Sequence, residues 1–569
     1  YVSQIVDTRT KEVVGVALKL LENKGWPELP IDLEPPIGDF AIICFPAAKT
    51  LKKDPSVIAE ELALELNELD VVASTSVEKG YCNINLKWDD FANKLVDEIS
   101  NESYGKGKGK KEKILIEHTS ANATGPFHMG RARNPIIGDS IARLLSYSGH
   151  DVKTEYYVND TGRQAVTLAY GIDNYKPEKE GKKDHRLVNC YRLASEELKD
   201  NDDIRKIIYR DMELIEKGDK KTLLKVREAA EQMLEGMKLS LQRLKVEADS
   251  YFHESNLIAS GVVDKVIEDL KQSKLCDEEN GAYYLDLEAE GIAGRNQKFF
   301  FTRKNGLSLY TTRDIAYHLD KFNRCDTALN ILGEDHKLQG RLLGIALREL
   351  KSKEPRNLFY SFVNLPGGKM STRAGRVVYL DDIMEQIVGL AKQKLGEGTS
   401  QRGRWKAEIK EHQREKLAEE IGIGALRYNI LKVQAEKGFT FNIEEALNLQ
   451  GDSAPFVMYS HARTSSILRK YGKDMPKPKL NCTLEDSEIK LLRTLAKWPR
   501  NVKKTASNLA IHNIPNYVHI LASDFNQFYR DCPVIEDENE SFRINLVKCS
   551  QKILRQGLAI LGIKAPDRM

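Results

Sequence analysis

The sequence predicts a multidomain α/β protein, and three features of its hydrophobic pattern support this class. Residues 1–104 alternate helical and strand-like segments, which indicates a small α+β N-terminal domain. The segment "KILIE" at 113–117 has the apolar run of a strand that is covered on both faces of a parallel sheet. From about residue 380 onward nearly every segment has helical periodicity, which predicts an all-α C-terminal bundle.

The central part of the chain is predicted to begin with a βαβ unit. After "KILIE" come a glycine-containing turn, an amphipathic helix pattern and the alternating segment "DVKTEYYVND" at 151–160. This order indicates a Rossmann-type parallel sheet, whose usual ligand site is the turn after the first strand. Residues from about 170 to 275 are charged and helical, and we interpret them as a helical insertion. We expect the sheet to resume with "GAYYLDLE" at 281–288 and to end near 356–376.

Breaks in periodicity divide the chain into predicted units. The segment "NESYGKGKGKKEK" interrupts the pattern with glycines and lysines, and it is typical of a linker. The predicted units are an α+β domain at 1–104, a linker at 105–112, a Rossmann-type domain at 113–379 with its insertion, a helical stem at 380–450 and a helical bundle at 451–569.

Charge is unevenly distributed. The whole chain carries a formal charge of only +3, but residues 451–569 hold 19 Lys and Arg against 12 Asp and Glu. Between Arg463 and Lys504 the counts are 12 basic against 4 acidic residues. A solvated helical face and an electrostatic footprint for nucleic acid both fit such a basic stripe.

The composition also limits the cellular context. No apolar run approaches the ~18 to 20 residues needed to cross a bilayer, and the first residues do not resemble a secretory signal. We therefore expect a soluble, cytoplasmic protein that does not bind membranes. The eight cysteines lack CxxC spacing, so we expect them to be reduced core residues and expect no structural zinc.

The segment "HTSANATGPFHMGRARN" at 118–134 is the first candidate site. Gly125 lies in a turn, His128 follows it, and Gly130 comes before the predicted helix. Free N–H groups at a helix start and a nearby imidazole suit a phosphate, although an ordinary βα turn has the same pattern. His118 and His128 lack a third ligand nearby, so the pattern does not favour a metal.

The segment "GGKMSTRAGR" at 367–376 is the second candidate. It differs from a Walker A loop, because Val363 occupies the position of the first glycine and Met370 follows Lys369. Taken alone, it fits a solvated basic loop better than a phosphate site.

Together the two segments resemble the signatures of class I aminoacyl-tRNA synthetases, His-x-Gly after the first strand and Lys-Met-Ser after the last. The segments "YVNDTGRQ", "LYTTRDIAYHLDK", "HARTSSILRK" and "LGIKAPDRM" are similar to segments of the arginyl-tRNA synthetase family, and "PPIGDFAIICFPAAK" resembles that family's additional N-terminal domain. Two positions depart from the usual signatures: Arg131 replaces a histidine, and Thr372 with Arg373 replaces Lys-Ser.

The resemblance implies ATP-dependent activation of L-arginine and its transfer to tRNA(Arg) for translation, with Mg²⁺ accompanying ATP, no bound prosthetic group and a monomeric enzyme. It also implies that bound tRNA is needed for activation and that the N-terminal domain contacts the tRNA. The implied catalytic residues are His128, Lys369 and Arg131. The implied ATP-binding residues are Gly125, Phe127, His128, Gly130, Gly333, Asp335, His336, Lys369, Met370 and Ser371. The implied arginine-binding residues are Glu117, Ser120, Asn122, Tyr310 and Asp314, and the implied tRNA-binding residues are Tyr459, Arg463, Arg469 and Met569.

Other interpretations stay open at this level. Asp314 can instead pair locally with Arg313 or lie exposed on a helix. The chain can be another adenylyl transferase, such as a class I lysyl-tRNA synthetase or a small-molecule nucleotidylyltransferase. It can also be an inactive RNA-binding relative, although it keeps His128, Lys369 and Ser371.

Overall fold

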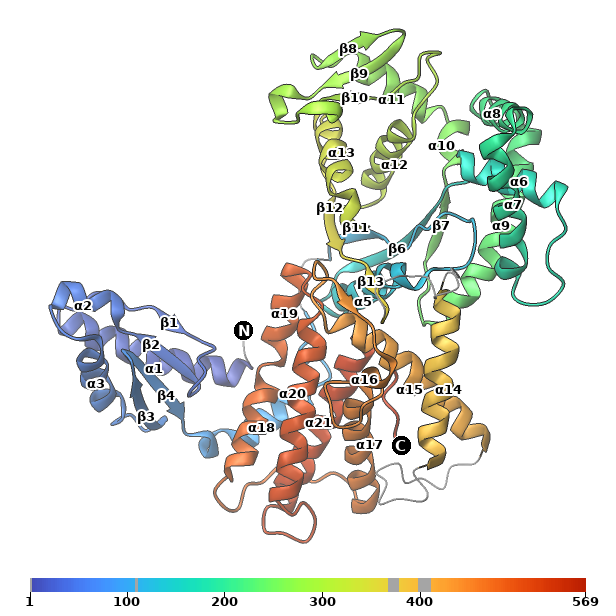
Figure 1. The fold of residues 1–569 in the computed structure, drawn as a ribbon. Helices are drawn as coiled ribbons and strands as arrows, with labels where there is room; N and C mark the ends of the chain where they lie inside the picture. The colour runs from blue at the N-terminus through green and yellow to red at the C-terminus, as the bar shows by residue number, and fades with distance from the viewer. Residues whose placement is uncertain (1–2, 108–110, 367–377, 398–410) are drawn as a thin grey trace.

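The computed structural model describes residues 3–107, 111–366, 378–397 and 411–569 (Figure 1). The N-terminal unit is an antiparallel sheet of order β1-β2-β4-β3 with helices packed on it. Helix α3 begins at Pro55 after the cap Asp54, whose side chain accepts the Ser56 N–H, and its apolar stripe is buried. The elements are α1 (Gln4–Asn23), β1 (Ile31–Asp32), β2 (Phe40–Ile43), α2 (Phe45–Leu51), α3 (Pro55–Leu66), β3 (Val72–Glu78), β4 (Tyr81–Leu86), η1 (Trp88–Asp90) and α4 (Ala92–Ser100).

The central unit is a parallel five-stranded sheet of order β12-β11-β5-β6-β7. Its strands are β5 (Lys113–Glu117), β6 (Asp151–Val158), β7 (Ser250–His253), β11 (Thr327–Gly333) and β12 (Arg356–Tyr360). Because β6 and β7 lie on one side of β5 while β11 and β12 lie on the other, the strand order reverses between β5 and β11. In open parallel sheets, ligands bind at the carboxyl ends of the strands at such a reversal. The predicted fold class is therefore confirmed.

Helices connect and cover this sheet (Figure 1). The turn after β5 leads through a short 3₁₀ helix into a helix whose residues are buried on nearly every side, because it packs between the sheet and the C-terminal bundle. These helices are η2 (Met129–Arg131), α5 (Arg133–Tyr147), α6 (Arg163–Asn174), α7 (Lys183–Asp200), α8 (Asp202–Glu216), α9 (Lys220–Arg243), α10 (Ser255–Ala259), α11 (Val262–Lys271), α12 (Tyr310–Arg324), η5 (Glu334–His336) and α13 (Lys337–Glu349).

The predicted continuation of the parallel sheet at 281–288 is wrong. That segment belongs to a separate antiparallel sheet of order β10-β9-β8, formed by β8 (Cys276–Glu279), β9 (Ala282–Asp286) and β10 (Lys298–Phe300), with η3 (Glu288–Glu290) and η4 (Gly294–Asn296) between β9 and β10. Conversely, β7 lies inside the stretch predicted as a helical insertion and forms an edge of the main sheet. With only four residues, β7 is too short to give a periodic signal.

The C-terminal half is helical, with one short parallel pair of strands. Two helices, α14 and α15, pack closely on each other, and the remaining ones form the bundle in the lower part of Figure 1. The elements are β13 (Val363–Asn364), α14 (Leu380–Glu397), α15 (Glu411–Leu431), β14 (Phe439–Thr440), α16 (Ile443–Ala446), α17 (Ala454–Tyr471), α18 (Asp486–Ala496), α19 (Trp498–Asn508), α20 (Asn513–Asp531) and α21 (Glu540–Ile560).

The bundle is joined to the central sheet through buried polar contacts. Arg427 on α15 is fully buried, and its guanidinium donates to the Leu561 carbonyl at 2.7 Å, to the Leu244 carbonyl at 2.9 Å and to the carboxylate of Asp139 on α5. A buried guanidinium requires this degree of pairing, since an unpaired buried charge is strongly destabilising. The helix that follows the first candidate site is therefore held in place by the bundle.

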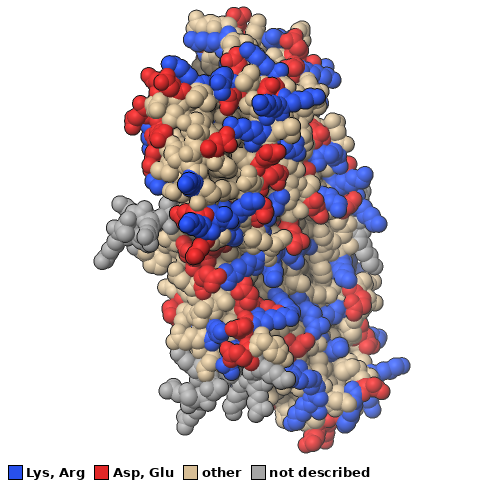
Figure 2. Space-filling view, turned by 90° about the vertical axis from the view of Figure 1, so that its right-hand side faces the viewer, with Lys and Arg blue, Asp and Glu red and all other residues tan. Residues whose placement is uncertain are grey.

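Part of the basic stripe serves internal contacts. The Arg493 guanidinium lies 2.6 Å from the carboxylate of Asp39 in the N-terminal unit, and Arg500 and Lys504 both face Glu34. These three residues of the stripe bind the N-terminal unit instead of presenting an uninterrupted basic face. Figure 2, which views the side of α8 and α9, shows basic and acidic side chains interspersed.

Among the described residues, no helix has both the length and the apolar character of a membrane span. All eight cysteines are unpaired thiols, and six of them are buried, as the sequence indicated.

Candidate active site

The turn after β5 is strained and held by neighbouring strands and helices. Thr119 and Ser120 adopt positive φ angles of 70° and 39°, an uncommon conformation for residues other than glycine and especially for the β-branched threonine. The Thr119 N–H donates to the side chain of Asn134 at 2.6 Å, and the Tyr157 N–H on β6 donates to Ser120 Oγ at 3.1 Å. Ser120, a predicted arginine-binding residue, is therefore fixed at the edge of the sheet.

His118 supports the turn from within the core. A Cβ atom added to Gly138 would lie 2.3 Å from His118 Cβ, so the absence of a side chain at Gly138 lets α5 approach this histidine. Burial lowers the pKa of His118 to about 4, and the imidazole is neutral at physiological pH. Its role is structural, as expected for a histidine without nearby metal ligands.

The first signature segment pairs through its main chain with residues that follow the second signature in the sequence. His128 forms an isolated antiparallel bridge with Tyr379, and the Leu380 N–H donates to the carbonyl of Phe127 at 2.8 Å. Residues 378–380 directly follow the Lys-Met-Ser segment, whose residues Lys369, Met370 and Ser371 lie outside the described part of the chain, as do Thr372 and Arg373. The first signature thus lies against the described residues 378–380.

The start of α5 differs from the expected helix start with free N–H groups. A 3₁₀ turn over Met129–Arg131 comes before the α-helix, and the N–H groups of Arg131 and Ala132 donate to the carbonyls of His128 and Met129, both at 3.0 Å. These N–H groups are therefore occupied inside the turn. His128 and Arg131 are exposed, whereas Phe127 and Gly130 are buried. Burial, and secondly the charge of Arg131, lower the pKa of His128, so its neutral ring is available as a hydrogen-bond donor.

The predicted ATP residues on β11 lie at the adjacent strand end. Gly333 closes β11, and the Asp335 carboxylate occupies the space beside it, since a Cβ atom at Gly333 would lie 2.5 Å from Asp335 Oδ1. Asp335 and His336 form the 3₁₀ turn that leads into α13. Because β11 neighbours β5, both groups of predicted ATP residues lie at the reversal of the strand order.

The predicted arginine-binding carboxylates are linked by a buried polar chain. Glu117 at the end of β5 lies 2.5 Å from the Lys321 ammonium on α12, and Asp314 on the same helix lies 3.1 Å from His318 Nδ1. Burial raises the pKa of Asp314, but its interactions with His318, and further Lys321, outweigh this effect and lower the pKa overall. Asp314 contacts His318 rather than its neighbour Arg313.

The remaining predicted arginine-binding residues flank this chain. Tyr310 begins α12, is 64% exposed, and lines a cavity of about 230 Å³ together with Asp314. Asn122 donates from its amide to the Gln164 side chain on α6 at 2.6 Å. Gln164 and Lys321 were missed at the sequence level, because a lone glutamine and a lone helical lysine carry no pattern.

Arg133 is another missed residue. It is fully buried at the start of α5 and donates to the main-chain carbonyls of Ser361, Lys437 and Gln434, each at 2.8 Å. Burial lowers the pKa of Arg133 to about 10, which still leaves it cationic at neutral pH. It fastens the first signature to β12 and to the loop after α15, and in the sequence it is simply one of two arginines in "RARN".

A polar cluster beside Tyr379 joins two helices. Asp184 and His185 on α7 and Asp381 on α14 have ligand atoms close enough together for a metal. However, the Lys182 ammonium lies 2.6 Å from the Asp381 carboxylate and 3.1 Å from that of Asp184, so a lysine already balances the acidic charge. We therefore interpret the cluster as a structural link between α7 and α14.

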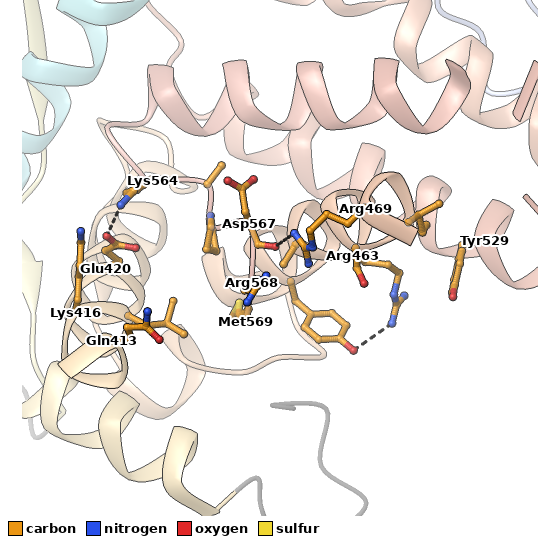
Figure 3. Close-up of a pocket in the computed structure, with 17 residues that line it drawn as sticks. Gln413, Lys416, Glu420, Arg463, Arg469, Tyr529, Lys564, Asp567, Arg568 and Met569 are labelled. Atoms are coloured by element: carbon orange, nitrogen blue, oxygen red, sulfur yellow. Dashed lines mark hydrogen bonds and ion pairs between the residues drawn. The ribbon is translucent and has the colours of Figure 1, made fainter. Parts of the chain in front are cut away.

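The four predicted tRNA-binding residues line one large pocket of about 890 Å³ between α15, α17 and the C-terminal tail (Figure 3). The Arg463 guanidinium lies 4.9 Å from the ring centroid of Tyr459 and 5.2 Å from that of Tyr529. Arg469 donates to the carbonyl of Asp567 at 2.9 Å, and Met569 is buried. The first two thus form a cationic and aromatic surface, while the last two hold the tail in position.

Models of three known domains match successive parts of the chain. Residues 9–86 match the arginyl tRNA synthetase N terminal domain, residues 94–443 the catalytic domain of tRNA synthetases class I (R), and residues 457–569 the DALR anticodon binding domain.

Individual proteins match over nearly their whole length. The chain is 38% identical to arginine–tRNA ligase of Methanocaldococcus jannaschii over 550 residues, which cover 94% of each chain. The arginyl-tRNA synthetase structure of Thermus thermophilus matches with a TM-score of 0.79 at 26% identity, covering 98% of this chain and 99% of that one. The arginyl-tRNA synthetase of Plasmodium falciparum has the same fold, with a TM-score of 0.79 at 18% identity over 100% of both chains.

The parallel sheet, its ligand turn and the domain matches define a class I aminoacyl-tRNA synthetase. The chain belongs to the arginyl-tRNA synthetase family. Its activity is that of an arginine–tRNA ligase, which uses ATP to activate L-arginine and transfers it to tRNA(Arg) for translation. Arginine, ATP and tRNA(Arg) are therefore its partners, and the interpretations as a lysine enzyme or a small nucleotidylyltransferase are excluded.

Proposed function

We propose that arginine is activated at the sheet edge between β5 and β11, with His128, Arg131 and Lys369 stabilising the charge that grows on the ATP phosphates. An oxygen of the arginine carboxylate attacks the α-phosphorus, the bond to pyrophosphate breaks, and arginyl-adenylate forms. A ribose hydroxyl of the terminal tRNA adenosine then attacks the activated carbonyl, and AMP leaves. The observation that supports this assignment is the bridge between His128 and Tyr379, because it places the first signature beside residues that follow the second signature in the sequence.

The proposed site has an ATP side and an arginine side. The ATP side consists of the turn after β5 and the turn after β11. The arginine side consists of residues facing α12 and α6, where carboxylates and amides match the five donors of a guanidinium. The ATP side comprises Gly125, Phe127, His128, Gly130, Gly333, Asp335, His336, Lys369, Met370 and Ser371. The arginine side comprises Glu117, Ser120, Asn122, Tyr310 and Asp314.

The tRNA completes the assembly. We assign its anticodon arm to the pocket of Tyr459, Arg463, Arg469 and Met569, since a guanidinium between two phenol rings suits stacked bases and phosphates. The N-terminal domain then contacts the body of the tRNA. The working units are 1–104, the linker 105–112, the catalytic domain 113–379, the stem 380–450 and the anticodon-binding bundle 451–569.

Other properties follow from the reaction class. Mg²⁺ accompanies ATP and offsets phosphate charge, and no prosthetic group or structural zinc takes part. The enzyme acts as a monomer, because one chain carries the sheet edge, both signatures and the anticodon pocket. We place it in the cytoplasm, where translation uses its product.

The test is ATP–pyrophosphate exchange with arginine and saturating tRNA. His128→Ala and Lys369→Ala should each lower turnover about 10²- to 10³-fold, as expected for losing one preorganised donor to the transition state. The Michaelis constant for arginine should stay nearly unchanged. Lys265→Ala, on the exposed side of α11, is the control and should behave as wild type. Unchanged turnover in either site variant would remove that residue from the proposal.

A further inference from the structure

Helix α12 buries a complete lysine side chain beside the arginine side of the site. Lys321 is 0% exposed, and its ammonium lies 2.5 Å from Glu117 Oε2 and 2.9 Å from Asn330 Oδ1. It also lies 4.2 Å from the ring centroid of Tyr317. A buried ammonium is costly unless it is fully paired, so this lysine depends on its partners as much as they depend on it.

The neighbouring histidine has a defined tautomer. His318 Nδ1 lies 2.9 Å from the main-chain oxygen of Asp314 and 3.1 Å from its carboxylate, so Nδ1 faces acceptors and carries the proton. His318 Nε2 faces the Asn330 amide at 2.9 Å and the Lys321 ammonium at 3.4 Å, and both of these groups are donors. Nε2 therefore accepts, and the ring is neutral in this arrangement.

These contacts form a continuous chain from Glu117 through Lys321 and His318 to Asp314. Two carboxylates, one ammonium and one neutral imidazole give the chain a formal charge of −1. The guanidinium of arginine carries a charge of +1, so one bound arginine neutralises the cluster. Without Lys321 the same carboxylates would carry −2, and the largely buried Glu117 would lose its cation.

Lys321 also determines which oxygen of the Glu117 carboxylate can accept a hydrogen bond from a ligand. Among the described residues, the Glu117 carboxylate has one hydrogen bond, from Lys321 to Oε2. A carboxylate held at one oxygen by a fixed cation has a restricted orientation, and its other oxygen, Oε1, can accept from a ligand.

We propose that Lys321 is a positioning residue for arginine recognition: it holds Oε2 of Glu117, presents Oε1 to the substrate guanidinium, and sets the charge of the recognition cluster to that of one monocation. This inference rests on the proposed function, in which Glu117 contacts arginine. Lys321 itself does not touch the substrate, and it acts through Glu117.

The experiment is a double-mutant cycle of Glu117→Gln and Lys321→Met, read by ATP–pyrophosphate exchange with tRNA. Lys321→Met should raise the Michaelis constant for arginine about tenfold or more, the factor expected when a charged hydrogen bond is misplaced, and should leave that for ATP unchanged. Because Lys321 acts through Glu117, the double variant should bind arginine no more weakly than Glu117→Gln alone. Lys265→Met is the matched control for removing a helical lysine.

The variants distinguish the site assignment from the proposed role of Lys321. If Glu117→Gln weakens arginine binding and Lys321→Met does not, the role of Lys321 is wrong while the site assignment stands. If Glu117→Gln leaves the Michaelis constant for arginine unchanged, the site assignment fails, and the inference about Lys321 fails with it. Lys321→Gln is a second variant that keeps a donor without the charge, and it should show an intermediate effect on arginine binding. Loss of the folded state in both Lys321 variants, measured by circular dichroism, would make Lys321 a stability residue and overturn the proposal.

Discussion

The ring of His128 lies 5.7 Å from the ring of Tyr379, centroid to centroid, and the two residues pair as an antiparallel bridge. Tyr379 also packs edge-on against His185 at 5.2 Å, and His185 lies 2.7 Å from the carboxylate of Asp381. The first signature is thus connected through Tyr379 to both α7 and α14. The chain at Tyr379, shortly after the second signature in the sequence, therefore has a defined position relative to His128.

Replacing Tyr379 should therefore affect the chemical step more than substrate binding. Tyr379→Ala removes the ring contact that orients His128, and we expect turnover in pyrophosphate exchange to fall about tenfold or more with little change in the Michaelis constant for arginine. Tyr209→Ala, at an exposed position on α8, serves as the control. A change confined to arginine binding would show that Tyr379 belongs to the other side of the site.

His118 gives a pH dependence to stability. Its folded-state pKa of about 4 is below the unfolded value, so the unfolded chain binds a proton that the folded chain does not. The stabilising contribution of the neutral ring is complete above about pH 6.5 and is lost as pH falls toward about 4, by about 3 kcal/mol. In His118→Asn this component of the pH dependence should disappear, and thermal unfolding midpoints measured across that pH range test it. Parallel curves for the variant and the wild type would refute the prediction.

Arg463 should contribute to tRNA affinity without affecting small-substrate binding. Arg463→Ala removes the cation between Tyr459 and Tyr529, so we expect weaker tRNA binding and a slope of log affinity against log salt that is smaller by about one. Filter binding at several salt concentrations gives both quantities. Arg192→Ala on α7 is the control, and an unchanged affinity and slope for Arg463→Ala would exclude the pocket as a phosphate contact.

Asn122 should affect arginine rather than ATP. Its amide donates to Gln164, which leaves its carbonyl oxygen to accept from the substrate. Asn122→Ala should mainly raise the Michaelis constant for arginine, consistent with losing a hydrogen bond to a charged group worth roughly 1.5 to 3 kcal/mol. His128→Ala should instead lower turnover or ATP affinity. Intact arginine binding in the Asn122 variant would show that this division of the turn is wrong.

The sequence predicted features that rest on local patterns. The apolar run "KILIE" and the pattern after it predicted the first strand and the connecting helix. The pattern at 281–288 gave a strand but not its sheet, because strand pairing depends on distant residues that periodicity does not report.

Single polar residues were the least predictable part of the site. Arg133, Arg427 and Lys321 look like ordinary helical charges in the sequence, yet all three are fully buried. Their partners are carbonyls or carboxylates far away along the chain, so only the folded structure brings them together.

The amino-acid specificity of tRNA-dependent ATP–pyrophosphate exchange tests the central assignment most directly. The carboxylates and amides that we assign to arginine binding match the five donors of a planar cation, and a site of this kind rejects analogues that leave its polar groups unpaired. We predict strong exchange with L-arginine in the presence of tRNA(Arg), and at most trace exchange with lysine or citrulline. Exchange with lysine as strong as with arginine would contradict the account.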